Sequence, residues 1–262
     1  EGCAWVNYVR CHDDIGWAID DADIAAAGFE PTAHRRFLTE FYTGRHPGSF
    51  ARGEPFQEEA DTGVARISGT LASLAGLEQA EESGDAAELA LAIGRIQLLH
   101  GIIATIGGIP LLYLGDEIAM TNDYGYGSDP AKAGDSRWLH RAPFDWGRAA
   151  QRHDPETVPG RVYQGILRLI QLRQQNPAFN LADTDFVATG NRHVLGYFRF
   201  NDHASVLVLA NFSEGEQRLE ARRLRQMGMR KTMVDLYAGR TVTATQELVM
   251  APYQFMVLSR AG

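Results

Sequence analysis

Two short apolar segments of this chain each run directly into a cluster of ionisable residues. The segment from Trp5 to Val9 reads as a buried strand and is followed by His12–Asp14. Ile109 to Leu114 reads as a second buried strand and is followed by Asp116 and Glu117. Ionisable groups at the end of a buried strand are costly unless water, partners or a substrate satisfy them. In α/β barrels the active-site residues come from the C-terminal ends of the strands, so both clusters are candidates for a functional site.

The residues between and after these strands favour helices joined by long loops. Apolar residues recur at helical spacing in residues 32–43, from about 85 to 105 and in residues 161–175. Residues 44–69 and 121–160 are rich in glycine, proline and polar residues, which predicts irregular loops. The predicted order is a strand, a long connecting segment, a helix, a second strand, a loop and a helix. This order makes two strand–helix units of a parallel α/β fold. A complete barrel of eight units needs about 250 residues, so we expect about six units to be absent from this chain.

The pattern changes after about residue 180. Short β-rich runs alternate with turn residues such as Gly190-Asn191 and Ala238-Gly239. We expect strands at 186–188, 193–199, 205–211, 232–236, 241–244 and 253–258. The sequence therefore predicts a small antiparallel β domain at 179–262, preceded by an α/β domain at 1–178.

Charge and cysteine content exclude several classes of partner. The net charge is −8 and no Lys/Arg-rich run is present, which argues against nucleic acid and against an anionic membrane surface. The longest apolar run, Gly101 to Gly115, is shorter than the roughly 20 residues that span a bilayer. Cys3 and Cys11 are the only cysteines and lie on one short segment, so a mutual disulfide is not expected. This favours a reducing compartment, and we predict a cytoplasmic location.

His12, Asp13 and Asp14 allow three interpretations. A carboxylate pair in a cleft serves acid/base, nucleophilic or transition-state roles, and a neighbouring histidine can hydrogen-bond a substrate hydroxyl. The same residues could form a structural ion pair or cap the turn before Gly16. They also offer metal ligands, but no second His/Asp cluster has the spacing of a known site, and we predict neither a metal nor a cofactor.

Other candidates are ambiguous from residue type alone. Arg137 lies in a loop after the second strand, where its guanidinium could hold a carboxylate or sugar hydroxyls or could simply be solvated. Arg66 has the same ambiguity. Phe37 belongs to an aromatic group that is more often core than a platform for a sugar ring. For Asp116 and Glu117 we favour a structural role, in which they cap the following turn.

The run from Trp5 to Trp17, WVNYVRCHDDIGW, resembles the His-Asp motif at the seventh barrel strand of the α-amylase superfamily. It is most similar to the amylosucrase and sucrose hydrolase group, with Cys11 where a serine is expected. The similarity covers nearly the whole chain. It continues through Gly48–Gly53, Pro55–Gln57, Arg66–Thr70, Gly108–Glu117, Asp135–Trp138, Asn211–Ser213 and Pro252–Gln254.

This resemblance implies the fold more closely. Residues 1–178 would be the end of a (β/α)8 TIM barrel, with a long insertion after strand seven at about residues 17–84. Residues 179–262 would be an all-β antiparallel sandwich domain.

The resemblance also implies roles for single residues. Asp13 would bind the hydroxyls of the glucosyl ring and stabilise the oxocarbenium-like transition state, and His12 would hydrogen-bond the same ring. Arg137 would form an ion pair that closes the pocket, near Asp13 or an acid earlier in the chain. The remaining substrate-binding residues would be Asp14 and Arg66, on the fructosyl or acceptor side, and Gly16 and Phe37.

The implied reaction is cleavage of sucrose through a covalent glucosyl-enzyme, with water or an α-glucan as acceptor. Water would make the enzyme a sucrose hydrolase, and a glucan would make it an amylosucrase. The nucleophile and the proton donor would lie on barrel strands four and five, in an N-terminal remainder that is covalently joined or a companion chain. Two other classes stay open: a non-catalytic carbohydrate-binding fragment and a metal-dependent hydrolase that uses His12, Asp13 and Asp14.

Overall fold

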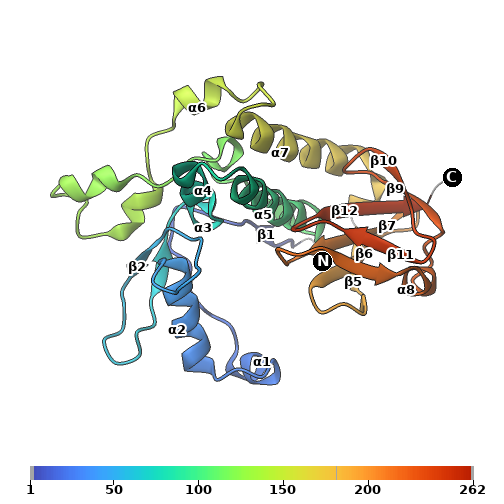
Figure 1. Ribbon diagram of the computed structural model, residues 1–262, viewed down its shortest axis with the longest axis horizontal. Helices are drawn as coiled ribbons and strands as arrows, with labels where there is room; N and C mark the ends of the chain where they lie inside the picture. Colours follow the sequence, from blue (N-terminus) through green and yellow to red (C-terminus); the bar gives the residue numbers. More distant parts are fainter. Residues whose placement is uncertain (1–2, 181, 261–262) are drawn as a thin grey trace. The chain divides into compact units, whose positions relative to one another are not determined.

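A computed structural model describes residues 3–180 and 182–260 of the chain (Figure 1). The internal contacts divide the protein into two compact units. One unit comprises residues 1–8, 94–111 and 161–262, and the other comprises residues 9–93 and 112–160.

The first unit is built on a six-stranded sheet in which every neighbouring pair is antiparallel. The strand order is β10-β9-β12-β7-β6-β5. The strands are β5 Asp183–Phe186, β6 Val194–Phe200, β7 Ser205–Asn211, β9 Thr232–Asp235, β10 Arg240–Thr243 and β12 Phe255–Arg260. A separate antiparallel pair joins β8 Gln217–Glu220 to β11 Glu247–Met250, and α8 Ala221–Gln226 follows β8. The predicted antiparallel β-sheet is therefore present.

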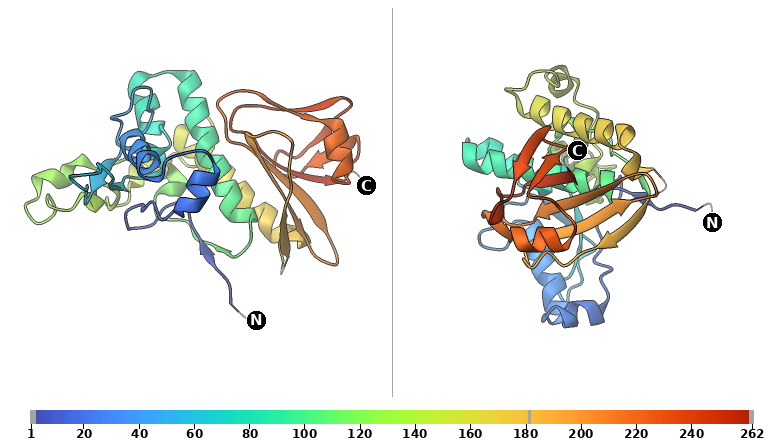
Figure 2. Two further views of the ribbon diagram at one scale, coloured as in Figure 1. Left: turned by 90° about the horizontal axis from the view of Figure 1, so that it is seen from below. Right: turned by 90° about the vertical axis from the view of Figure 1, so that its right-hand side faces the viewer.

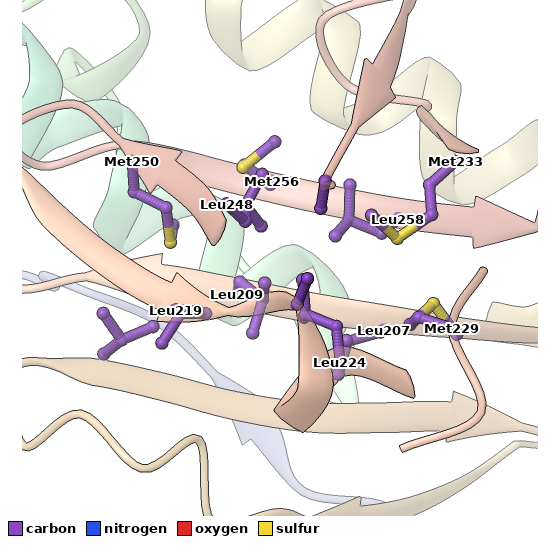
Figure 3. Close-up of a cluster of buried hydrophobic side chains, with 13 residues drawn as sticks. Leu207, Leu209, Leu219, Leu224, Met229, Met233, Leu248, Met250, Met256 and Leu258 are labelled. Atoms are coloured by element: carbon purple, nitrogen blue, oxygen red, sulfur yellow. The ribbon is translucent and has the colours of Figure 1, made fainter. Parts of the chain in front are cut away.

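Both faces of this sheet are buried, which explains the continuous apolar run in β7. Leu207 and Leu209 point into one core cluster with residues of β8, β11 and α8 (Figure 3). Val206 and Val208 belong to a second cluster, on the other face, with residues of two helices. Those helices are α5 Ala86–Thr105 and α7 Val158–Gln175, which lie beside the sheet in Figure 2. Alternate residues of one strand thus fill two different cores.

Helix α5 is long and apolar enough to cross a membrane by length and composition alone. The core helix of a globular protein passes the same test. Here Leu98 and Ala104 of α5 are buried in the second cluster against the sheet. The absence of a membrane partner stays a prediction.

The two apolar segments that precede the ionisable clusters form a short parallel pair. Strand β1, Val6–Asn7, pairs with β4, Ile109–Pro110, and the Ile109 amide donates to the Trp5 carbonyl at 2.8 Å. The parallel direction agrees with the expected α/β arrangement. The expected burial is wrong, because Trp5 is 85% exposed and Ile109 57% exposed. Parallel sheets are normally covered on both faces, and a two-stranded ladder of two residues a side does not provide that cover.

The second unit contains short helices and one hairpin. The helices that lie wholly within residues 9–93 are α1 Asp21–Ala26, α2 Pro31–Tyr42, α3 Leu71–Leu74 and α4 Leu77–Ser83. The hairpin pairs β2 Glu54–Phe56 with β3 Arg66–Ser68. Residues 112–160 add the 3-10 helices η1 Asp116–Ile118, η2 Tyr124–Ser128 and η3 Ser136–His140, and the helix α6 Trp146–Ala150. A further 3-10 helix, η4 Pro177–Phe179, belongs to the first unit.

The three helices expected from apolar spacing are present as α2, α5 and α7. Helix α2 starts where the sequence signals a start, because Pro31 occupies its first turn and the Glu30 carboxylate accepts from the Thr32 and Ala33 amides. The prediction of irregular structure throughout residues 44–69 is wrong, since β2 and β3 lie there. Residues 121–160 were also expected to be loop, yet they contain η2, η3 and α6.

The hairpin forms because of a contact far away in the sequence. Ile67 is fully buried, and its backbone exchanges two hydrogen bonds with Ile15, at 2.8 and 2.9 Å. A strand of three residues has too few positions to show a period of two. The strand therefore becomes recognisable only once the segment around Ile15 lies beside it.

Candidate functional site

Every residue predicted for the site belongs to the second unit. His12, Asp13 and Asp14 follow β1 along the chain, Arg66 opens β3, and Arg137 lies in η3. The His12 and Asp13 side chains are exposed, at 72% and 51%. Accessible charged groups of this kind can meet a ligand without first moving a cover.

Asp13 lies against the guanidinium of Arg137. The Asp13 Oδ1 accepts from Arg137 Nη1 at 3.1 Å, which is one of the two ion pairs that the resemblance allowed for Arg137. Arg137 also binds Asp135 with two more nitrogens, Nε to Oδ1 and Nη2 to Oδ2, both at 2.9 Å. The guanidinium lies over the Phe56 ring, 4.6 Å from its centre. Arg137 is thus held on three sides before any ligand arrives.

The charges in this cluster influence one another. Hydrogen bonding to Asp135, and then to Asp13, raises the pKa of Arg137. The hydrogen bond from Arg137 lowers the pKa of Asp135 in turn. The arrangement favours a guanidinium beside two carboxylates at any pH near neutrality.

Sequence reasoning missed a second guanidinium at this place. Arg141 Nη2 lies 3.8 Å from the same Asp13 oxygen, and Arg141 Nη1 lies 4.0 Å from Asp135 Oδ2. His12 Nε2 lies 3.8 Å from Asp13 Oδ2. The spacing of four residues between Arg137 and Arg141 is the only signal that could have indicated a shared face.

Asp14 and Arg66 form a second pair beside the first. Asp14 Oδ2 lies 3.6 Å from Arg66 Nη1, with the carboxylate side chain 9% exposed and the guanidinium side chain 55% exposed. The resemblance implied that both residues contact the fructosyl or acceptor side of a substrate. The structure brings them together and leaves the Arg66 guanidinium open to solvent.

Gly16 and Phe37 are placed differently. A Cβ atom on Gly16 would have no heavy atom within 4 Å, so the backbone there borders open space. Phe37 lies in α2 and is 39% exposed, and its ring contacts His34, Phe41 and His46 at centroid distances of 5.1 to 6.3 Å. Phe37 is therefore part of an aromatic cluster on α2, and none of these contacts connects it to the Asp13 ion pairs.

A cavity of about 160 Å³ borders the same region. Its lining includes Tyr113, Asp116, His140 and Arg141. Burial raises the pKa of Asp116 to about 7, against the opposing charge of Arg10. Glu117, the neighbour of Asp116, accepts the Gly115 amide at 2.8 Å at the start of η1.

Within residues 3–180 and 182–260, no group of three or more His, Cys, Asp and Glu side chains is placed to hold a metal ion. The side chains gathered around Asp13 offer carboxylate, guanidinium and imidazole groups. Such groups accept from and donate to sugar hydroxyls, and a fixed carboxylate stabilises positive charge that develops nearby.

Comparison with known proteins finds a family match for part of the chain. Residues 190–259 match the family described as the cyclo-malto-dextrinase C-terminal domain. A cyclomaltodextrinase of Geobacillus thermopakistaniensis is 27% identical over 173 residues, which are 63% of this chain and 25% of that protein. A maltogenic alpha-amylase of Bacillus acidopullulyticus is 26% identical over 125 residues, which are 47% of this chain and 18% of that protein. The chain thus spans a quarter or less of the length of these relatives.

The fold has a counterpart among solved structures. A crystal structure of AmyP in complex with maltotriose superposes with a TM-score of 0.54 and 20% sequence identity, covering 71% of this chain and 37% of AmyP. At this identity the likeness concerns the fold alone. Residues 190–259, which hold most of the antiparallel sheet, are therefore similar to the cyclo-malto-dextrinase C-terminal domain.

Proposed function

We propose that this chain supplies one wall of the substrate site in a retaining enzyme of the α-amylase family that takes the glucosyl unit from sucrose. The observation that carries the proposal is the fixed carboxylate of Asp13, which lies between Arg137, Arg141 and His12. An accessible carboxylate whose direction is set by cations before substrate binds is suited to stabilising a transition state.

In this proposal Asp13 is a third carboxylate and not the nucleophile. A retaining glycosidase uses two carboxyl groups about 5–5.5 Å apart, one as nucleophile and one as proton donor. The nucleophile forms a bond to the anomeric carbon while the bond to the fructosyl oxygen breaks, and that oxygen takes the donor's proton. Asp13 accepts hydrogen bonds from ring hydroxyls and offsets the positive charge of the ring. His12 donates to or accepts from the same ring.

We propose that the nucleophile and the proton donor come from a further part of the same enzyme, joined covalently or present as a companion chain. The short coverage of the two relatives, 25% and 18% of their lengths, supports this. In the complete enzyme residues 1–178 would close a (β/α)8 barrel. Residues 17–84 would be an insertion after its seventh strand, and residues 179–262 would be the C-terminal sandwich.

The choice of sucrose as the donor is supported by the motifs between Trp5 and Gln254 that resemble the amylosucrase group. The ion pair of Asp14 and Arg66 supports it as well. Asp14 and Arg66 offer an acceptor and a donor together, with the guanidinium open to solvent. That pair suits the fructosyl hydroxyls of sucrose or the first sugar of an acceptor glucan. Water as acceptor gives glucose and fructose, which we propose as the main outcome, and α-glucan synthesis is the alternative outcome.

A second candidate is cleavage of α-glucans. The relatives that match are named as a cyclomaltodextrinase and a maltogenic alpha-amylase, and this favours glucan donors. The same wall residues would serve either donor, because both present a glucosyl ring to Asp13. A donor panel separates the two candidates, since only one donor class should give turnover above background.

The test uses the full-length protein that contains this chain, incubated with sucrose, maltotriose or a cyclodextrin. Release of fructose from sucrose supports the proposal, and turnover of the glucans alone supports the second candidate. Asp13→Asn should abolish turnover while the circular dichroism spectrum stays unchanged. The matched control is Asp21→Asn, which removes another exposed carboxylate from an arginine pair, with Arg35 at 2.5 Å, and should keep full activity.

A further inference from the structure

The carbonyl group between His12 and Asp13 receives two side-chain donors. The His140 Nε2 atom lies 3.1 Å from the His12 carbonyl oxygen, and Arg141 Nε donates to the same oxygen at 2.8 Å. This carbonyl belongs to the peptide that leads into Asp13. His140, the last residue of η3, and Arg141, which follows it, thus fix the plane of that peptide. The plane of the peptide in turn sets the direction in which the Asp13 side chain leaves the backbone.

The other ring nitrogen of His140 has a partner that fixes the tautomer. The Gly69 amide donates to His140 Nδ1 at 3.1 Å. A backbone amide can only donate, so Nδ1 must be unprotonated. A backbone carbonyl can only accept, so Nε2 must carry the proton that it gives to His12. The two bonds together admit one neutral form of the ring, and an imidazolium would lose the bond to Gly69.

The surroundings of His140 favour this neutral form. The residue is 3% exposed. Two cations face it, because Arg10 donates to the Gly69 carbonyl at 2.9 Å and Arg141 is the next residue in the chain. Tyr113 donates to the His140 carbonyl at 3.1 Å, and Asp116 lines the same cavity. Burial, and then the charge of Arg10, lowers the pKa of His140 to about 4.

Gly69, whose amide donates to His140 Nδ1, lies close in the chain to Arg66, the partner of Asp14. It directly follows β3, the strand that Arg66 opens. The ring of His140 therefore lies between the peptide that carries Asp13 and the strand that carries Arg66. We infer that His140 is a positioning residue: as a single neutral tautomer it sets the His12–Asp13 peptide against the end of β3. The inference rests on the proposed function of Asp13.

Two amide replacements separate the two bonds of the ring. In His140→Gln the side-chain amide reaches the place of Nε2 and can still donate to His12, whereas in His140→Asn the amide oxygen takes the place of Nδ1 and can still accept from Gly69. In the full-length enzyme, His140→Gln should keep kcat within about threefold. His140→Asn should lower kcat by about tenfold or more, because the carboxylate loses its fixed direction. KM should change less than kcat in both variants.

A purely structural role gives a different pattern. The two variants would then have equal kcat values, or losses of kcat that follow their losses of melting temperature, and either result overturns the inference. The control is His100→Gln, which replaces a second buried histidine, in the other unit, whose pKa burial also lowers to about 4. It should lower the melting temperature and leave kcat unchanged.

A spectroscopic measurement tests the tautomer without relying on turnover. The ¹⁵N spectrum of histidine-labelled full-length protein should contain one ring, missing from His140→Gln, with Nε2 protonated and Nδ1 bare from about pH 5.5 to 8. Protonation of Nδ1 in that range contradicts the inference. If the wild-type protein cleaves neither sucrose nor α-glucans, the proposed function fails while this spectrum still decides on the tautomer.

Discussion

Asp13 obtains its properties from neighbours that are distant in the sequence. The carboxylate belongs to a motif near the start of the chain, but its fixed direction depends on Arg137 and Arg141, more than 120 residues later. The resemblance carried by the motif implied an ion pair of Arg137 with Asp13 or with an acid earlier in the chain, and the structure has the pair with Asp13. Arg141 and His140 were missed, because η3 is a single short 3-10 helix and the four-residue spacing of Arg137 and Arg141 does not by itself indicate which residues they contact.

Replacing Arg137 by lysine tests whether the several N–H donors of its guanidinium are needed. Arg137 holds Asp13 and Asp135 at the same time, which a single ammonium group cannot do in the same geometry. We expect Arg137→Lys to lower kcat/KM of the full-length enzyme by about tenfold or more. Steady-state kinetics on the preferred donor measures this, with Arg45→Lys, in an ion pair with Glu58, as the control. Unchanged kcat/KM in Arg137→Lys would contradict the positioning role.

His140 also predicts a dependence of stability on pH. Its pKa is about 4 in the folded protein against 6.5 for an ordinary histidine, so the unfolded chain binds more protons between these values. The free energy of unfolding should therefore rise with pH from about 4 to 6.5 and then level off, by at most about 3 kcal/mol from this group. Denaturant unfolding of wild type and His140→Gln at several pH values measures the difference. A difference that does not change with pH would refute the buried neutral ring.

Among the elements, the β2–β3 hairpin shows where sequence patterns stop being informative. Its strands have three residues each, and their pairing depends on the bridge between Ile15 and Ile67. The helices α2, α5 and α7 were predictable because each is long enough to repeat its apolar face several times. Strands β8 and β11 were missed for the same reason as the hairpin, since a four-residue strand shows its alternation only twice.

Gly53 makes a sharp test of the hairpin's packing. A Cβ atom there would lie 2.7 Å from the Tyr42 carbonyl oxygen and 2.9 Å from that of Ser68, and backbone atoms cannot move aside cheaply. We expect Gly53→Ala to lower the free energy of unfolding by about 1–3 kcal/mol. Gly127→Ala is the control, because its Cβ would have no heavy atom within 4 Å. Equal stability of the two variants, measured by chemical denaturation, would show that the hairpin packs differently.

At the scale of the whole molecule, the antiparallel sheet is the part that sequence and structure describe alike. The inner strand β7 was predictable because its apolar residues 206–210 follow one another without a break, which is compatible with burial on both faces. The parallel pair β1–β4 was predictable in direction and wrong in burial, since side chains on so short a ladder remain exposed. Sequence pattern therefore indicates which residues prefer the interior, and the extent of the sheet decides which of them reach it.

The double-sided sheet predicts the effect of removing a core side chain. Leu207 is fully buried in the cluster with β8, β11 and α8 (Figure 3). Leu207→Ala should lower the free energy of unfolding by about 2–5 kcal/mol, through lost burial and the cavity left behind. Val249→Ala, at a position 41% exposed on β11, should change it by less than about 1 kcal/mol. Similar losses in both variants would contradict this core.

The central claim is that Asp13 works as a fixed carboxylate in sucrose cleavage, and one measurement tests it most directly. Glucose and fructose released from sucrose are quantified for the full-length protein, for Asp13→Asn and for Asp21→Asn. The account predicts cleavage by the wild type and by Asp21→Asn, and none above background by a folded Asp13→Asn. Near-normal cleavage by Asp13→Asn would contradict it.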